Sequence, residues 1–189
     1  ESNRSMCIPK EQHARCILEY IYFARPDAYI DGVSVYESRL IAGRSLAKHH
    51  PVDADLVVGV PESGNVAAMG YAMERGIPYG MAFVKNSYVG RPFIKPKQSS
   101  RESSVRIKLN VLTEAVKGKR VIMIDDSIVR GTTSDRIVGM LREAGAKEVH
   151  VRISSPPFLH PCYFGTDIPS EDQLIAHNRS VDEICKIIG

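Results

Sequence analysis

Four short apolar runs that alternate with amphipathic segments constrain the fold of this chain more than any other feature. The apolar runs lie at about 55–60, 80–84, 119–124 and 148–154. Runs of this length with few polar residues are typical of strands buried on both faces. Helical periodicity fills the intervals at about 34–49, 65–75 and 133–144. Such alternation predicts an α/β fold, with a mostly parallel sheet, right-handed crossovers and helices on both faces.

The helix ends carry local signals. Ser34 and Glu37 have the spacing of a capping box, in which the serine caps the helix and the glutamate reaches back to it. The same pattern at 170–173 and at 180–183 predicts two short helices in the tail. The stretch 85–108 has no clean period, so we expect a long loop there.

Length and composition describe one soluble globular domain. With 189 residues, of which 43% are hydrophobic and 25% charged, the chain can bury a core without disulfides or a structural metal. The net charge of +3 is far below that of a dedicated nucleic-acid-binding protein, and no run approaches the roughly 18 apolar residues of a membrane span. We therefore expect neither a nucleic-acid partner nor a membrane.

The four cysteines, at positions 7, 16, 162 and 185, form no C-x-x-C pair. Their spacing alone therefore does not indicate a metal site. The default interpretation is reduced, buried thiols in a cytoplasmic protein.

The third apolar run leads into the most informative segment. The run ends in two carboxylates, Asp125 and Asp126, and a turn of small residues then enters a helix. Ligands of parallel sheets collect beyond the carboxyl ends of the strands, where the first turn of a helix presents unpaired N–H groups. Gly131 would let the backbone approach a phosphate closely. Hydroxyl donors follow at Thr132, Thr133 and Ser134.

The two carboxylates suit a different part of the same ligand. They would repel a phosphate, but they can accept hydrogen bonds from sugar hydroxyls or bind hydrated Mg2+. The combination predicts a site for a sugar phosphate. Alternatively, the acids merely cap a turn and the hydroxyl residues form the N-terminal cap of the helix.

The segment Asp125-Asp126-Ser127-Ile128-Val129-Arg130-Gly131-Thr132-Thr133-Ser134 resembles the phosphoribosyl pyrophosphate motif of type I phosphoribosyltransferases, and more narrowly that of the amidophosphoribosyltransferase family. Four further segments resemble the same family in the same order, at 19–27, 59–63, 85–94 and 154–157. The resemblance runs from about Cys16 to Gly189. It implies the type I phosphoribosyltransferase fold, a mostly parallel α/β sheet with a long flexible loop.

The resemblance also bears on domain organisation. Nothing here resembles the N-terminal glutaminase domain of that family, and the chain begins with Glu1 rather than Met. We therefore expect residues 1–189 to be one phosphoribosyltransferase domain, a fragment that lacks the glutaminase domain and a C-terminal extension.

The implied activity is that of a glycosyltransferase at the first step of purine synthesis. The family transfers ammonia derived from glutamine to C1 of 5-phosphoribosyl 1-pyrophosphate, which gives 5-phosphoribosylamine and pyrophosphate. The fragment alone would use free ammonia at most. The implied partners are phosphoribosyl pyrophosphate, purine nucleotide inhibitors, the glutaminase domain of the same polypeptide and further copies of the chain in a homo-oligomer.

The resemblance assigns roles to two turns. The 5-phosphate would lie on the turn after the third run, with Ser127 and Arg130 among its contacts. The pyrophosphate would lie on a second strand-to-helix turn, although those residues also suit a plain turn: Gly59, Pro61, Glu62, Ser63 and Gly64. We expect the Glu62 side chain to turn away from the pyrophosphate. The family places a Mg2+ contact at the residue matching Ser63, beside those matching Asp125 and Asp126.

The segment 85–108 carries seven basic residues against one acid. Such a segment is ordinarily a solvated loop, but a long loop without structure of its own is more often a lid or a disordered segment than a passive connection. A carbocation-like ribose must also be shielded from water. The resemblance favours a lid in which Lys85, Arg91 and Lys108 neutralise the leaving pyrophosphate. Tyr36 matches a position that the family uses near the pyrophosphate, although an aromatic residue there also suits the core.

Two cysteines acquire a second interpretation from the resemblance. In one branch of the family a 4Fe-4S cluster is held by four cysteines, and Cys16 and Cys162 match two of these positions. The other two would lie beyond Gly189. Cys7 and Cys185 match no ligand position, so we expect no intact cluster in this fragment.

Two other functions suit the same motif. The first is a non-catalytic regulator of the same fold that senses phosphoribosyl pyrophosphate or purine nucleotides. Such a protein would need a nucleic-acid-binding surface or a fused DNA-binding module, and neither the net charge nor any segment supplies one. The second is a salvage transferase for another base, against which the 85–94 segment and the two cluster-type cysteines argue.

Overall fold

The structure, a computed structural model, describes residues 15–85 and 109–189, apart from residues 164, 167 and 169. Most of the predicted loop, including Arg91 and Lys108, lies outside the described residues, as does Cys7. Within the described ranges, no helix has the length and apolar character needed to cross a membrane.

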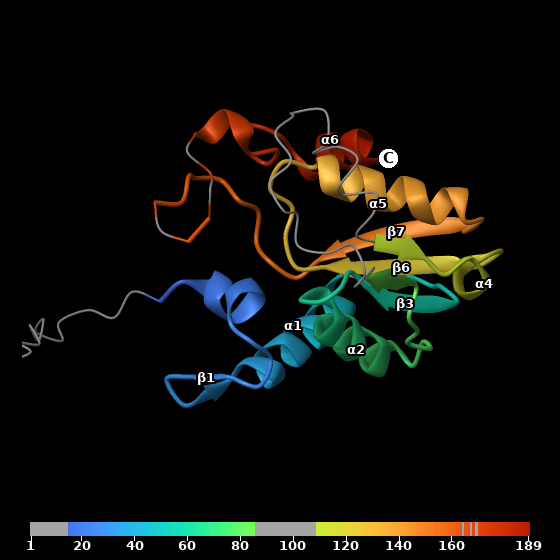
Figure 1. The fold of residues 1–189 in the computed structure, drawn as a ribbon, viewed down its shortest axis with the longest axis horizontal. Helices are drawn as coiled ribbons and strands as arrows, with labels where there is room; N and C mark the ends of the chain where they lie inside the picture. Colours follow the sequence, from blue (N-terminus) through green and yellow to red (C-terminus); the bar gives the residue numbers. More distant parts are fainter. Residues whose placement is uncertain (1–14, 86–108, 164, 167, 169) are drawn as a thin grey trace, which may run out of the picture.

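The centre of the molecule is a parallel sheet of three strands in the order β3–β6–β7 (Figure 1). The strands are β3 (Leu56–Gly59), β6 (Arg120–Asp125) and β7 (Glu148–Ile153). In register, Val57 lies opposite Ile122, which in turn lies opposite His150. Residues 121–124 of β6 are completely buried. The prediction of a mostly parallel sheet is therefore confirmed.

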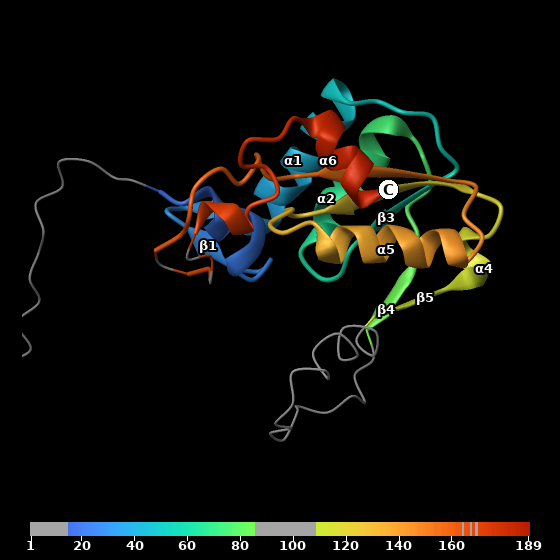
Figure 2. The same ribbon diagram turned by 90° about the horizontal axis from the view of Figure 1, so that it is seen from above.

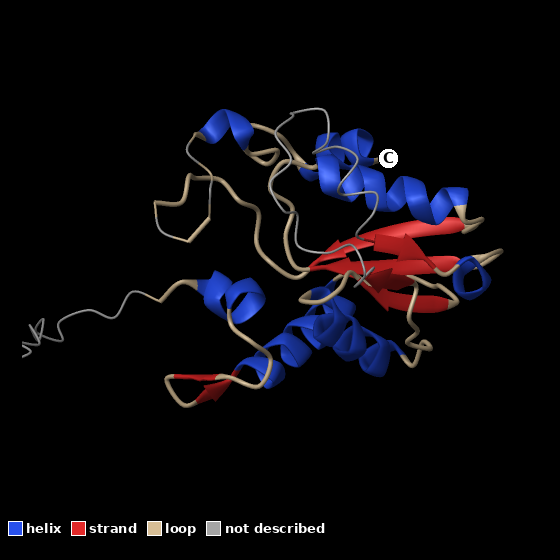
Figure 3. Ribbon diagram, viewed as in Figure 1, coloured by secondary structure: helices blue, strands red, loops and turns tan. Residues whose placement is uncertain are grey.

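Helices cover both faces of this sheet (Figure 3). On one face lie α1 (Val35–His49) and α2 (Gly64–Arg75). On the other lies α5 (Thr132–Glu143), with α6 (Val181–Ile188) packed against it. The core on the α2 side contains Val57, Ile122 and Ile124, and the core on the α5 side contains Leu56, Val58, Val121 and Met123. Successive residues thus enter opposite cores, which explains why the apolar runs are continuous.

Serine caps form at two of the three positions where a capping box was predicted, and the full box is present at one of them. Ser34 Oγ accepts a hydrogen bond from the N–H of Glu37 at 3.3 Å. At α6 the capping box is complete, because Glu183 Oε2 also accepts from the N–H of Ser180 at 2.7 Å. The third prediction is confirmed only in part, because a short helix follows Ser170 but the cap is absent. After Ser170 the chain forms a single 3-10 turn, η2 (Glu171–Gln173), without a side-chain cap.

The region after α2 differs from the prediction. The second apolar run forms β4 (Phe83–Lys85), which pairs in antiparallel fashion with β5 (Leu109–Val111) outside the main sheet. Tyr79 forms an isolated parallel bridge to Val57 of β3. A short helix, α4 (Thr113–Val116), precedes β6. Strands of three residues and a helix of four are too short to show a period in the sequence.

The elements before α1 had no counterpart in the prediction. A π-helical turn, η1 (Glu19–Phe23), leads to a hairpin of β1 (Tyr29–Ile30) and β2 (Val33–Ser34). Asp31 and Gly32 join these strands with φ values of 51° and 80°. An Asp-Gly pair with two positive φ values is the signal of a type I′ hairpin turn.

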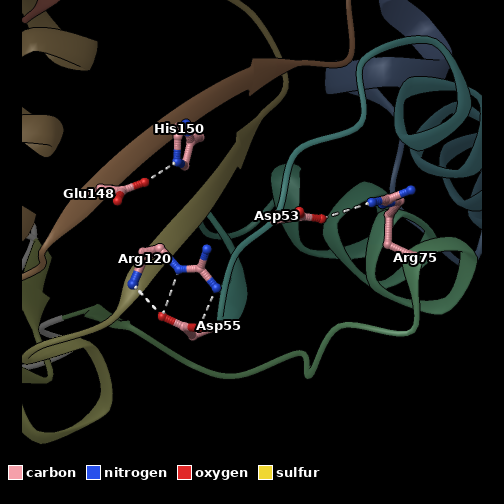
Figure 4. Close-up of polar contacts among 6 residues, drawn as sticks. All are labelled: Asp53, Asp55, Arg75, Arg120, Glu148 and His150. Carbon is pink, nitrogen blue, oxygen red and sulfur yellow. Dashed lines mark hydrogen bonds and ion pairs between the residues drawn. The ribbon is translucent and has the colours of Figure 1, made fainter.

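A salt bridge fastens β3 and β6 at their amino ends (Figure 4). Asp55 accepts hydrogen bonds from the guanidinium of Arg120 at 2.8 Å and from its backbone N–H at 2.9 Å. These bonds lower the pKa of Asp55 to about 2. Two more pairs lie nearby, Arg75 with Asp53 at 3.3 Å and His150 with Glu148 at 3.0 Å.

The backbones of α1 and α2 approach each other closely at two glycines. A Cβ added to Gly43 would lie 1.9 Å from the carbonyl oxygen of Ala67. A Cβ added to Gly70 would lie 2.2 Å from the carbonyl oxygen of Leu40. Because both obstacles are backbone atoms, a side chain at either position forces the helices apart.

We predict that Gly43→Ala and Gly70→Ala each destabilise the fold by about 1–3 kcal/mol, the range typical of overpacking. Gly139→Ala in α5 is the control, since nothing lies within 4 Å of the added Cβ. That variant should gain about 0.5–1 kcal/mol from helix propensity. Urea unfolding followed by circular dichroism measures all three, and equal stabilities would contradict the close packing.

Candidate active site

A cleft of about 950 Å³ opens beyond the carboxyl ends of β3 and β6. Residues from four segments of the chain line it, within 18–26, 60–63, 125–134 and 158–168, together with Arg39 and Lys85. Figures 1 and 2 show η1 and the segment after β7 beyond this end of the sheet. The cleft therefore lies where a parallel sheet collects its ligands.

Asp125 and Asp126 lie where β6 ends, and each is 8% exposed. The carboxylate of Asp126 accepts hydrogen bonds from Ser127 Oγ, at 2.6 Å, and from Ser63 Oγ. Asp125 Oδ1 accepts from the N–H of Asp126 at 2.8 Å. Because Ser63 belongs to the turn after β3, its bond to Asp126 joins the two strand ends within the cleft.

Burial raises the pKa of Asp125 to about 7, and the charge of Asp126 contributes to the increase. The hydrogen bond from the Asp126 N–H opposes this shift by stabilising the carboxylate. Two adjacent, poorly solvated carboxylates carry charge that a cation would neutralise. The acidic pair also offers the oxygen ligands that Mg2+ prefers.

Residues 129–134 are called the phosphate loop below; they comprise the end of the turn after β6 and the first residues of α5, and all of them line the cleft. Its Gly131 has a φ of 82° and is the N-terminal cap of α5. No side chain caps this helix. The first N–H groups of α5 lack intrahelical partners and lie at the positive end of the helix dipole, so they can bind an anion.

The turn after β3 brings Pro61, Glu62 and Ser63 to the same cleft. The peptide bond between Pro61 and Glu62 is cis. Glu62 Oε1 lies 3.2 Å from Nζ of Lys85, which also lines the cleft. Lys85, predicted to neutralise pyrophosphate, is thus paired with an acid of the protein in this structure.

Several predicted site residues lie away from the cleft. A Cβ on Gly59 would lie 2.6 Å from Asn65 Cα, and one on Gly64 would lie 2.6 Å from the Ile124 carbonyl oxygen. These two glycines therefore permit close packing and do not line the cleft. Tyr36, in the first turn of α1, does not line it either and is 36% exposed.

The two cysteines predicted as cluster ligands occupy different environments. Cys16 is exposed, and Cys162 is half-buried. Among the residues that the structure describes, no group of three or more His, Cys, Asp or Glu side chains is placed to hold a metal ion. The predicted Mg2+ site differs from such a group because it combines two carboxylates with a hydroxyl.

Sequence reasoning missed Arg39, a cation of α1 that is 5% exposed and lines the cleft. Its Nε donates to the Tyr20 carbonyl at 2.7 Å, and its Nη2 donates to the Ala24 carbonyl at 2.8 Å. Burial lowers the pKa of Arg39, while the charge of Asp126 opposes this. Arg39 thus fastens η1 to α1, and its charge interacts favourably with that of Asp126. Its backbone partners lie 19 and 15 residues earlier, so no local pattern reveals it.

Sequence reasoning also missed the apolar surface of the cleft. Tyr22 and Phe23 are 52% and 38% exposed, and their rings meet edge to face at 5.2 Å. Phe158 and Ile168 line the cleft from the segment after β7. The aromatic-rich sequence of η1 was the signal that could have revealed this apolar surface. The segment is part of the family resemblance, but the resemblance gave it no role.

Comparison with known proteins shows which class this fold and cleft define. Residues 36–154 match the family model described as the phosphoribosyl transferase domain, and the chain belongs to this family. The predicted fold class is thereby confirmed.

Within this class, the chain is similar to amidophosphoribosyltransferases. It is 59% identical over 179 residues to the amidophosphoribosyltransferase of Archaeoglobus fulgidus, which covers 95% of this chain and 39% of that protein. It is 57% identical over 174 residues to that of Bacillus subtilis, covering 92% and 37%. The resemblance predicted from the motifs is confirmed.

A solved structure agrees with these matches. Glutamine phosphoribosylpyrophosphate amidotransferase from B. subtilis, complexed with ADP and GMP, aligns with a TM-score of 0.82 at 57% identity. The alignment covers 92% of this chain and 38% of that chain. The chain therefore spans about two fifths of the length of the relatives it matches.

We predict that Asp125 makes the stability of the fold depend on pH. Its carboxyl group ionises near pH 4 in an unfolded chain, but its pKa in the folded protein is about 7. The folded state thus favours the protonated form. The contribution of this group to stability is complete below about pH 4 and is lost as the pH rises through about 7.

The measurement is the free energy of unfolding in urea, with EDTA present, across this pH range. Wild type should lose on the order of 3 kcal/mol relative to Asp125→Asn, which cannot ionise. Parallel curves for the two proteins would show that Asp125 ionises normally.

Proposed function

We propose that residues 1–189 form the phosphoribosyltransferase domain of a longer amidophosphoribosyltransferase. The reaction is displacement of pyrophosphate from C1 of 5-phosphoribosyl 1-pyrophosphate by ammonia, which gives 5-phosphoribosylamine and begins purine synthesis. The observation that carries the proposal is a pair of strand-to-helix turns that open on one cleft and are joined there by Ser63 and Asp126. A substrate with phosphate at one end and pyrophosphate at the other matches this arrangement.

In this proposal the phosphate loop holds the 5-phosphate. The N–H groups at the start of α5 are the main donors, and Thr132, Thr133 and Ser134 line the cleft beside them. The turn 61–63 holds the pyrophosphate, near Lys85. The acidic pair then faces the ribose, whose hydroxyls are suitable donors to carboxylates.

A Mg2+ ion fits the residues at the end of β6. Ser63, Asp125 and Asp126 offer a hydroxyl and two buried carboxylates, all of them oxygen ligands. Mg2+ usually takes one or two carboxylates and completes its shell with substrate phosphates and water. When bound, the ion would neutralise charge on the leaving pyrophosphate.

The residues of the chain act by positioning and by excluding water. Ammonia is already a good nucleophile, so the reaction requires no strong general base. Holding the substrate at both ends fixes C1 in one orientation toward the nucleophile. Tyr22, Phe23 and Phe158 give the cleft an apolar surface that keeps water from the carbocation-like ribose.

In the complete protein, glutamine would supply the ammonia through a domain outside this chain. The B. subtilis relative is a glutamine amidotransferase, and this chain matches 38% of it. Its structure with ADP and GMP supports purine nucleotides as ligands of this protein, and their role as inhibitors stays a prediction. A homo-oligomeric state and a cytoplasmic location stay predictions.

The described residues do not by themselves fit an iron–sulfur cluster. A 4Fe-4S cluster takes four cysteine thiolates, and the resemblance matches two, Cys16 and Cys162. We propose the cluster for the longer protein, with its other ligands beyond Gly189, and assign it no step.

The test is pyrophosphate release by the 189-residue chain supplied with phosphoribosyl pyrophosphate, Mg2+ and ammonium. Release should depend on ammonium and stop when EDTA removes the metal. Asp126→Asn should lower kcat/KM by about 100-fold or more, because a charge is lost where the two turns meet.

Asp55→Asn is the matched control for this experiment. Asp55 joins the same two strands at their other ends, so its loss should leave kcat/KM unchanged. A folded chain that binds phosphoribosyl pyrophosphate but releases no pyrophosphate would contradict the proposed activity and favour the sensing function.

A further inference from the structure

The phosphate loop rests against a distant part of the chain. Residues 170–177, called the brace below, include η2 and run alongside the loop. The N–H of Ile175 donates to the carbonyl of Val129 at 2.8 Å. Leu174, Ile175 and Ala176 are 1%, 5% and 6% exposed, so the brace is anchored by burial.

The side chain of Ile175 lies directly against Gly131. A Cβ added to Gly131 would be 2.3 Å from Cδ1 of Ile175. Gly131 has a left-handed backbone and caps α5, so its conformation sets the direction of the first N–H groups of that helix. Ile175 lines a separate apolar cavity of about 400 Å³, not the cleft, and therefore supports the loop from outside the site.

Gln173 makes a second contact from the brace. Its Oε1 accepts a hydrogen bond from Nη2 of Arg130, a phosphate-loop residue that lines the cleft. Its Nε2 donates to Ser170 Oγ at 3.4 Å, which orients the amide. The brace thus contacts the loop through both its backbone and its side chains.

Glu171 fastens the brace to another wall of the cleft. Its carboxylate lies 3.3 Å from Nδ1 of His160 and 3.4 Å from Nε2 of His177. Nδ1 of His177 lies 3.2 Å from the carbonyl oxygen of Leu159. Leu159 and His160 follow Phe158, which lines the cleft. The brace therefore links the phosphate loop to the segment after β7.

We infer that Ile175 and Gln173 are positioning residues for the 5-phosphate of the substrate. Neither needs to touch the ligand. Ile175 fixes the conformation of Gly131, and Gln173 fixes the direction of Arg130, so the donors are aligned before the phosphate arrives. This inference rests on the proposed function, because it assumes that the loop binds a phosphate ester.

The experiment measures affinity by calorimetry on the 189-residue chain, with two probes. Ribose 5-phosphate reports on the phosphate loop, and Mg2+ with pyrophosphate reports on the turn after β3. Ile175→Ala and Gln173→Ala should each weaken ribose 5-phosphate binding by about tenfold, the equivalent of one misaligned hydrogen bond to a charged group. Binding of pyrophosphate should not change.

Ile188→Ala is the matched control. Ile188 lines the same apolar cavity from α6 and is also 5% exposed, so its truncation removes equal volume without acting on Gly131. It should leave both affinities unchanged. If Ile175→Ala unfolds the protein, Ile175→Val removes Cδ1 alone, and it should still weaken ribose 5-phosphate binding relative to Ile188→Val.

Four outcomes would count against the inference or the function on which it rests. Equal effects of the changes at Ile175 and Ile188 on ribose 5-phosphate binding would overturn the positioning role. So would a finding that Ile175→Ala weakens the binding of both probes equally. A wild-type chain that binds pyrophosphate but not ribose 5-phosphate would overturn the assignment of the loop. A folded wild type that binds neither would contradict the proposed function itself.

Discussion

The complete burial of β6 is the constraint on which the rest of the structure depends. β3 and β7 pair with its two edges, and helices cover its two faces, so residues 121–124 can carry no charge. Its acids therefore appear where the sheet ends, at Asp125 and Asp126. Parallel pairing brings Ser63 to the same edge, and its bond to Asp126 joins the two turns of the cleft.

The buried carboxylates of Asp125 and Asp126 make folding less favourable but favour the binding of a suitable ligand. Burying adjacent carboxylates is unfavourable, as the raised pKa of Asp125 shows. The hydroxyls of Ser63 and Ser127 and the positive charge of Arg39 compensate in part. Because the two carboxylates are only partly compensated, the site is stabilised most by a ligand that brings both a cation and hydroxyl donors. A Mg2+ complex of a phosphorylated sugar brings both.

The sequence allowed the fold and the two turns to be predicted because their signals are local. Val121 to Ile124 form a continuous apolar run, and Ser34 and Ser180 cap the helices that directly follow them. Contacts between distant residues could not be predicted in this way. Arg39 is held by carbonyls of an earlier segment, and Ile175 lies against Gly131, which is distant from it in the sequence.

The region after Ser170 shows how such contacts override a local signal. Its sequence has the capping-box pattern, but Glu171 contacts two histidines and Gln173 accepts from Arg130, so the chain closes into one 3-10 turn. The resemblance supplied the roles of the site residues, which periodicity alone could not. It also drew attention to η1 without indicating that its aromatic rings line the cleft.

The central claim is that one cleft holds both ends of phosphoribosyl pyrophosphate across the ends of β3 and β6. A crystal structure of the chain with this ligand and Mg2+ tests it most directly. The account predicts the 5-phosphate on the N–H groups of the phosphate loop, the pyrophosphate on the turn 61–63, and the metal beside Ser63 and Asp126. A ligand bound outside the cleft, or bound with its two ends exchanged, would contradict it.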